Sequence, residues 1–520
     1  PNPTLSQKIA SGFHRSVTCN VEAGVHAEEN RVNQVADRVN TTGTVWLGVT
    51  MECAQCHDHK YDPFSMEDYY SLFAFFNNTP LEVTLPEGVS DVQHNFIGPY
   101  LDLPEPEAKT KRREEATQSL AEAKKARDAL KQEKKNDHPE VKALDKKIAE
   151  LTKEEKELAR DKTLVMVERD EPRRTHIMKR GDYLSPAEEV EPGTPELLPP
   201  LQEAKERPNR LDLARWIVRR DNPLTARVAV NRWWAEIFGQ GIVVTLEDFG
   251  TQAEPPTHPE LLDWLAVEFM ESGWDMKHLL KTMVMSRAYR QSSRTTPALQ
   301  EKDPRNLFFA RAPRFRMDAE RLRDNALSVS GLLSTKMHGK PVMPYQPPNM
   351  WRQIGRNEPK WIEDKDDDRW RRGIYIVYRR AAPYPSMVNF DAPDRASCTV
   401  NRPRTNTPLQ ALTLLNDPAY VEMAYALADR ILSEAHPDDR CDHAFLLATG
   451  RPPKTAERAR LQELLDDRLS RFDENPGAID EVLANPNFIY QAKHHDRKEL
   501  AAWFFLGNVL LNLDEAMTKN

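Results

Sequence analysis

The chain has 520 residues, enough for roughly two to four domains with a substantial core. Hydrophobic residues make up 39% and charged residues 30%, a soluble composition, and no apolar run reaches the length of about eighteen residues that a membrane-spanning helix needs. The net charge of −8 argues against a general nucleic-acid-binding protein.

The sequence begins Pro1-Asn2-Pro3-Thr4, without the basic end or the apolar core of a signal peptide. We therefore expect that a leader was removed, or that the N-terminal part of a longer chain is missing. The lack of a leader here does not argue against export.

Residues 1–100 are predicted to form a small domain that contains a cysteine motif. Apolar side chains recur on one face of a helix expected over residues 28–45, at Val32, Val35, Ala36 and Val39. A second helix is expected over residues 66–76, with Ser65 as its N-cap.

Residues 101–182 are predicted to form a charged helical hairpin. The segment has no aromatic residue and is dense in Lys, Glu and Ala. A heptad pattern of apolar residues runs from 141 to 158 and a weaker one from 116 to 130, with a turn at residues 136–139 between them. The antiparallel hairpin that we expect is either a docking arm for a partner or a solvated strut inserted in a domain.

The rest of the chain is predicted to be a Pro-rich extended linker, residues 183–208, and a mostly helical domain, residues 209–520. Long ordered loops are expected over residues 338–408, with one strand at 373–378. The sequence therefore predicts a mainly α fold with little β structure. Its helices are expected at 210–219, 226–238, from 258, at 274–289, 318–335, 408–434 and in the last hundred residues.

The motif that carries chemistry is Cys53-Ala54-Gln55-Cys56-His57, the C-x-x-C-H pattern of covalent haem attachment. Two thiols at this spacing can bind the two vinyl groups of one porphyrin, and the adjacent imidazole becomes the proximal iron ligand. Three other interpretations remain: a zinc site that adds His59, a redox-active dithiol, and a plain disulfide. The other cysteines, Cys19, Cys398 and Cys441, are either isolated thiols or include one disulfide, Cys398–Cys441 or Cys19–Cys398.

The surroundings of this motif resemble the planctomycete cytochrome-like domain of unknown function, and the second half of the chain resembles its usual partner, the planctomycete-specific PSD domain. The first resemblance is carried by WLGVTMECAQCHDHKYDP at residues 46–63, DYY at 68–70, IASGF at 9–13 and EENRV at 28–32. The second is carried by NPLTARVAVNRWW at 222–234, DFG at 248–250, FDAPDR at 390–395, CTV at 398–400, RTNTPLQAL at 404–412 and LNLDE at 511–515.

The resemblance covers nearly the whole chain except the charged hairpin. It implies an exported protein, periplasmic or otherwise extracytoplasmic, whose full-length relatives often carry a further cytochrome c domain. Such a domain would be a redox partner. The family name asserts a cytochrome but implies no particular reaction.

Several residues are candidates for further roles around a haem. The distal iron ligand is undetermined, with Met66, His26, His14, His59 and His94 as candidates by residue type. His59 and Asp62 either stabilise the turn after the motif, or one of Asp58, His59 and Asp62 acts in proton transfer at the haem edge. His494-His495-Asp496 is either an exposed polar pair or a metal site.

A second group of candidates lies in the loop 379–404, which is dense in charged and polar residues. The loop forms either an ion-pair network or a cleft where arginines bind an anion and aspartates bind the hydroxyls of a sugar. The residues are Arg379, Arg380, Asp391, Asp394, Arg395, Asn401, Arg402 and Arg404.

Two functions therefore follow from the sequence. The first is an extracytoplasmic protein with one covalent haem c, which transfers electrons or acts as an oxidoreductase on a carbohydrate or other small molecule. The second is a non-enzymatic binding or scaffold module in which a haem or a metal is structural. Whether the chain is an enzyme, and whether it forms oligomers, the sequence leaves open.

Overall fold

The computed structural model describes residues 3–19, 26–84, 95–133, 138–202, 207–351, 360–380, 382–493 and 496–519. These residues are mainly helical, as the sequence predicts, and their strands form two-stranded antiparallel sheets. None of the helices in these ranges is long and apolar enough to span a membrane. The chain divides into a first unit, Pro1–Thr42 with Met51–Trp216, and a second unit, Gly43–Thr50 with Ile217–Asn520.

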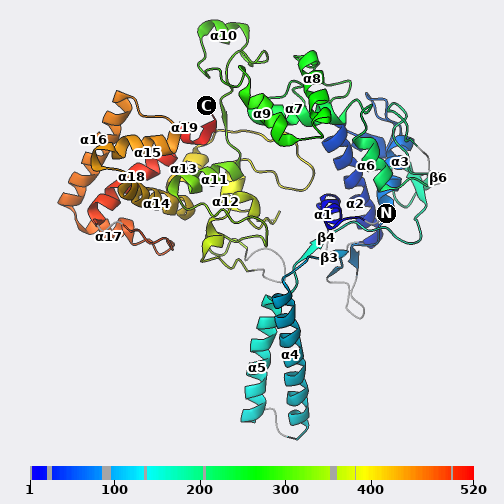
Figure 1. Cartoon of the computed structure of the whole chain (residues 1–520), viewed down its shortest axis with the longest axis horizontal. Coiled ribbons are helices and arrows are strands. Elements are labelled where there is room, and N and C mark those ends of the chain that lie inside the picture. Colours follow the sequence, from blue (N-terminus) through cyan, green and yellow to red (C-terminus); the bar gives the residue numbers. More distant parts are fainter. Residues whose placement is uncertain are drawn as a thin grey trace. The chain divides into compact units, whose positions relative to one another are not determined.

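Helices α2 (Ala27–Thr42) and α3 (Met66–Asn77) form the core of the first unit (Figure 1). The apolar face predicted for α2 is buried, with Val35 and Val39 fully covered. Helix α3 begins where the sequence predicts, because Ser65 and Asp68 form a reciprocal capping box: the Ser65 hydroxyl accepts the Asp68 N–H, and the Asp68 carboxylate accepts the Ser65 N–H. The expected helix over residues 66–76 is thus confirmed.

The other elements of the first unit are mostly short. They are α1 (Leu5–Ala10), α6 (Arg210–Ile217), β1 (Val83–Thr84), β2 (Asn95–Phe96), β3 (Tyr100–Asp102), β4 (Lys162–Leu164), β5 (Thr175–Met178) and β6 (Pro186–Val190). Strands pair in the order β1–β2, β3–β4 and β5–β6.

Two long helices, α4 (Glu107–Glu133) and α5 (Pro139–Glu157), run side by side in opposite directions beyond β3 and β4 (Figure 1). Their antiparallel register follows from the ion pair of Arg127 with Asp145 at 3.7 Å, and the seam between them buries Leu120 and Val141. Most other side chains on these helices are exposed, as their charge predicts.

Part of the segment predicted to be an extended linker, residues 183–208, is a paired strand. Residues 186–190 form β6. This strand pairs with β5, Thr175 opposite Val190, and Arg174 donates from Nε to Glu189 Oε1 at 2.7 Å. Pro and Glu are poor strand formers, so the partner strand rather than local propensity decides the structure here.

The second unit is built from helices around two buried clusters. One cluster lies between α7, α8 and α9, and the other lies between α11, α14 and α18. The elements are α7 (Thr225–Phe238), α8 (Pro259–Glu271), α9 (Met276–Met285), α10 (Pro297–Lys302), α11 (Ala319–Ser330), α12 (Pro385–Asn389), α13 (Pro408–Asn416), α14 (Pro418–Glu434), α15 (Arg440–Thr449), α16 (Thr455–Glu474), α17 (Gly477–Leu483), α18 (Arg497–Leu511), α19 (Asp514–Met517), β7 (Phe315–Arg316) and β8 (Thr518–Lys519).

The prediction of a strand at residues 373–378 is wrong. Gly373–Tyr375 is a 3-10 turn, and only Ile376 makes an isolated bridge, with Val342. The Gly373 N–H donates to Asp324 Oδ1 at 2.7 Å, which ties the turn to α11. The β-branched residues favour a strand, but no neighbouring strand is present among the described residues to pair with them.

The segment Gly43–Thr50 follows α2 directly and packs within the second unit. Arg232 on α7 donates to the Val45 carbonyl at 2.7 Å, and the Phe249 N–H donates to the Gly48 carbonyl at 2.7 Å. Arg232 and Phe249 belong to the stretches at 222–234 and 248–250 that carry the resemblance to the PSD domain. These residues therefore have a structural role, which is to hold the segment that precedes the cysteine motif.

Candidate haem-attachment site

Both cysteines of the motif belong to one short turn with their thiols exposed. The 3-10 turn Glu52–Gln55 is closed by the Cys56 N–H, which donates to the Cys53 carbonyl at 3.3 Å. Cys53, Cys56 and His57 are all exposed, whereas Ala54 is fully buried beneath them. The turn therefore presents two thiols and an imidazole on the surface of the first unit.

The hydrogen bond of His57 defines which ring nitrogen carries the proton. Its Nδ1 lies 2.7 Å from the backbone carbonyl oxygen of Asp58. A carbonyl oxygen can only accept, so Nδ1 is the donor and the Nε2 lone pair is left for a ligand. Proximal histidines need this tautomer, because a bond from the other nitrogen orients the ring.

Helix α3 holds the motif from below through two hydrogen bonds. The Tyr70 hydroxyl donates to the Gln55 carbonyl at 2.8 Å, and the Met66 N–H donates to Asp58 Oδ1 at 2.8 Å. Burial raises the pKa of Tyr70, so its hydroxyl remains a donor. The Asp58 carboxylate also lies at the helix N-terminus, where the dipole favours negative charge.

A glycine from a distant part of the sequence lies against the second cysteine. Gly181 has φ +74°, and a Cβ added there would lie 2.8 Å from the Cys56 Sγ. Any larger residue at this position would therefore displace the thiol as well as strain the backbone.

His59 and Asp62 stabilise the turn that follows the motif. The Asp62 N–H donates to the His59 Nδ1 at 2.8 Å, and the His59 N–H donates to the Phe64 carbonyl at 2.8 Å. Because Nδ1 accepts this bond it is unprotonated, so its 3.7 Å approach to the Asp62 carboxylate is not an ion pair. Both side chains are nearly buried, which favours the structural interpretation of these two residues over proton transfer.

The donors of the motif can be compared with each cofactor that the sequence suggests. In the described ranges no three His, Cys, Asp or Glu side chains are grouped so that they could hold one metal ion. All five cysteines are described, and they carry thiols rather than disulfides. Two exposed thiols followed by an imidazole with an unprotonated Nε2 fit covalent haem attachment.

The candidates for a distal ligand occupy different environments in the first unit. Met66 lies in the first turn of α3, close to the motif, and His26 is exposed beside Tyr183, at a ring-centroid distance of 5.9 Å. His14 packs against Phe76 at 4.9 Å, which is about 9 Å along the helix axis from Tyr70. His94 lies outside the described residues.

The loop 379–404 contains paired charges. Asp391 pairs with Arg316 and accepts the Thr405 N–H at 2.8 Å. Glu320 on α11 accepts from Arg402 at 2.8 Å and lies 4.0 Å from Arg395. These contacts match the ion-pair network that was one of the two interpretations of this loop.

Three of the remaining candidates in the loop also contact other residues of the chain. Asp394 accepts the Ala396 N–H at 2.8 Å, and Arg379 stacks over Trp351 at 4.6 Å. Arg404 donates to the Gly239 carbonyl at 3.3 Å and lies over the Phe315 ring. Arg380 is exposed. In the polar stretch near the C-terminus, Asp496 caps α18, whereas residues 494 and 495 lie outside the described ranges.

Sequence reasoning did not identify Tyr70, Asp58 and Gly181 as supports of the motif. Tyr70 and Asp58 lie within the stretches that carry the family resemblance, but nothing local distinguishes them from core or surface residues. Gly181 gives a weak signal, because glycine is scarce between residues 98 and 181.

Comparison with known families gives two matches. Residues 1–80 match PSCyt2, described as a protein of unknown function (DUF1549), and residues 209–465 match PSD1, described as a protein of unknown function (DUF1553). No curated protein and no solved structure was found to match the chain.

Proposed function

Because the chain has the planctomycete PSCyt plus PSD architecture, we propose that it is an extracytoplasmic protein that carries one haem c, bound covalently through Cys53 and Cys56. The exposed C-x-x-C-H turn with its oriented imidazole is the observation that carries this proposal. The extracytoplasmic location is supported by the resemblance of this chain to a family whose members look exported.

Each residue of the motif has a defined task in this proposal. Cys53 and Cys56 would hold the porphyrin by thioether bonds, and His57 would bind the iron through Nε2 while the Asp58 carbonyl keeps its ring in position. A bound haem supplies one-electron transfer, and the protein sets its orientation and access. Exposure of the motif suits exchange of electrons with a redox partner such as another cytochrome domain, and an oxidoreductase would use the same electrons on a small-molecule substrate.

The test is a reduced pyridine haemochrome spectrum of protein that was exported in a host with cytochrome c maturation and then extracted with acid acetone. We expect a c-type band that survives extraction, and its loss in the double variant Cys53→Ala/Cys56→Ala. Cys398→Ala removes another exposed thiol and should keep the band. Absence of covalent haem from the unaltered protein would refute the proposal.

The helical hairpin α4–α5 favours a second candidate function, binding of a partner by a scaffold module. Its exposed faces carry dense charges of both signs, as in helices that recognise complementary partners, although such faces are often only solvated. A haem-loaded protein that shows no reversible reduction, but captures a partner through the hairpin, would favour this function over electron transfer.

A further inference from the structure

The second unit contains a cavity of about 980 Å³ with an excess of arginine in its wall. Its volume lies near the upper end of small-molecule sites, which range over roughly 300–1,000 Å³. The wall comes from the end of α7, residues 293–295 before α10, residues between 304 and 315 after it, the end of α15, and α19. Five arginines line it, Arg294, Arg305, Arg311, Arg314 and Arg451, against one carboxylate, Glu515.

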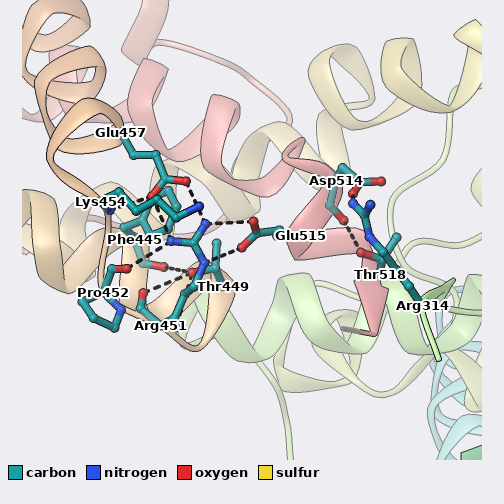
Figure 2. A network of polar contacts seen from close by, with 10 residues as sticks. All are labelled: Arg314, Phe445, Thr449, Arg451, Pro452, Lys454, Glu457, Asp514, Glu515 and Thr518. Atoms are coloured by element: carbon teal, nitrogen blue, oxygen red, sulfur yellow. Dashed lines mark hydrogen bonds and ion pairs between the residues drawn. The ribbon is translucent and has the colours of Figure 1, made fainter. Parts of the chain in front are cut away.

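Arg451 is part of the wall and has no donor left for a ligand. Its guanidinium makes paired hydrogen bonds of 2.8 Å with Glu457 and with Glu515, and it also donates to the Pro452 carbonyl (Figure 2). All five N–H groups of the guanidinium are thereby used. The one carboxylate that lines the cavity is committed to this arginine.

Two further arginines are offset by acidic residues. Arg314 pairs with Asp514 (Figure 2), and Arg305 lies 3.5 Å from Glu254 at an exposed position. These pairs leave little net charge for a ligand.

Arg311 is held by backbone carbonyls rather than by a carboxylate in the described part of the chain. Its two terminal nitrogens donate to the carbonyls of Asp303 at 3.0 Å and Pro304 at 2.9 Å, which fix the guanidinium in place. The Asp303 carboxylate accepts the N–H groups of Leu307 and Phe308 rather than a hydrogen bond from Arg311. Within the described ranges no ion pair joins Arg311 to a carboxylate, and some of its N–H groups are available.

Arg294 is the second cation without an acidic partner in the described part of the chain, and it is exposed at the cavity. The hydroxyl-bearing residues Ser293 and Thr295 lie beside it. Near the lining residue Phe315, Arg404 and Lys519 lie 4.4 Å and 5.7 Å from the centre of its ring and add positive charge. The cavity is therefore a positive site in a chain whose net charge is −8.

We propose that this arginine pocket binds an anionic sugar, a polyol that bears a sulfate or a carboxylate group. The guanidinium groups of Arg294 and Arg311 bind the acidic group, since guanidinium forks match the geometry of oxyanions. The hydroxyl and amide groups of Ser293, Thr295 and Gln240 suit the hydroxyls of the ring. A cavity of this volume is too large to select a bare inorganic ion.

The test is calorimetric titration of the 520-residue chain with a galactose sulfate, with glucuronate, with neutral galactose and with inorganic sulfate. We expect at least one of the two acidic sugars to bind, and to bind more tightly than galactose or sulfate. Arg294→Gln and Arg311→Gln should each weaken that binding about tenfold or more. Arg460→Gln, at an exposed pair with Glu463 on α16, makes the same charge change outside the cavity and should leave binding unchanged.

If Arg311→Gln fails to fold, Arg294→Gln remains a valid test, because the Arg294 side chain is exposed and makes no hydrogen bond or ion pair with the described residues. The proposal is overturned if neither acidic sugar binds, if galactose or inorganic sulfate binds as tightly as the acidic sugars, or if Arg294→Gln and Arg460→Gln have equal effects. No arm of this test measures haem, so its result is independent of the haem proposal.

Discussion

The close approach of Gly181 to Cys56 makes a quantitative prediction about the motif. Alanine at this position must adopt φ +74°, which costs about 1–2 kcal/mol for an L residue. Its Cβ would also lie 2.8 Å from the Cys56 Sγ, well inside the optimal contact distance of about 3.5–4.0 Å. Overpacking of this kind costs about 1–3 kcal/mol more, so Gly181→Ala should lose about 2–5 kcal/mol of local stability.

A matched control separates the two contributions. Gly273 has nearly the same φ, +75°, but a Cβ there would meet nothing within 4 Å. Gly273→Ala should therefore lose only the backbone cost of about 1–2 kcal/mol. The measurement is hydrogen exchange of the peptides around each site, which reports the free energy of local opening.

The same pair of variants tests the link to haem attachment. We expect intact-mass spectrometry to find less covalent haem on Gly181→Ala than on the unaltered chain, because the clash moves the Cys56 thiol. Gly273→Ala should be loaded normally. Equal opening free energies and equal haem loading in the two variants would refute the reasoning.

Two other predictions concern the first unit. Burial, and then the charge of Arg38, lower the pKa of His14 from 6.5 to about 4, so its neutral form stabilises the fold above pH 6.5 and this contribution, up to about 3 kcal/mol, is lost as the pH falls toward 4. Urea unfolding across this range should show the loss, His14→Phe should reduce it, and an unchanged pH dependence in that variant would contradict the assignment. Replacement of residues 107–157 by a short Gly-containing turn should leave haem loading intact, because β3 and β4 already pair and the Leu103 N–H donates to the Asp161 carbonyl at 2.9 Å. Loss of haem or of helical circular dichroism beyond the deleted helices would show that the hairpin is needed for folding.

Features determined by neighbouring residues could be predicted from the sequence. Ser65 caps α3 through Asp68, three residues away, so the start of this helix is encoded locally. Residues 373–378 have strand propensity, but the bond from Gly373 to Asp324 on another helix imposes a turn. The pairing of residues 186–190 with β5 likewise depends on a partner that composition does not reveal.

In the candidate sites, too, the features set by local sequence could be predicted, and those that depend on distant residues could not. Cys53, Cys56 and His57 are recognisable because the chemistry requires a fixed spacing. The contact of Gly181 with the Cys56 thiol depends on the fold, and so does the arginine pocket, whose Arg294 and Arg311 lie outside the loop 379–404 that we considered as an anion cleft. Within that loop, Asp391 pairs with Arg316 and Arg402 pairs with Glu320, and both partners lie outside the loop. Charge density alone cannot predict these partners.

The packing of Gly43–Thr50 within the second unit limits how the two family modules could be exchanged by recombination. The match of residues 1–80 to one family suggests a module that recombination could move alone, yet part of it folds with the second unit. A chain that ended near residue 208 would lose Arg232 and Phe249, and with them the donors to the Val45 and Gly48 carbonyls. Exchange of one module without the other would therefore produce a poorly folded product, and we expect the two to pass through evolution as a single genetic unit.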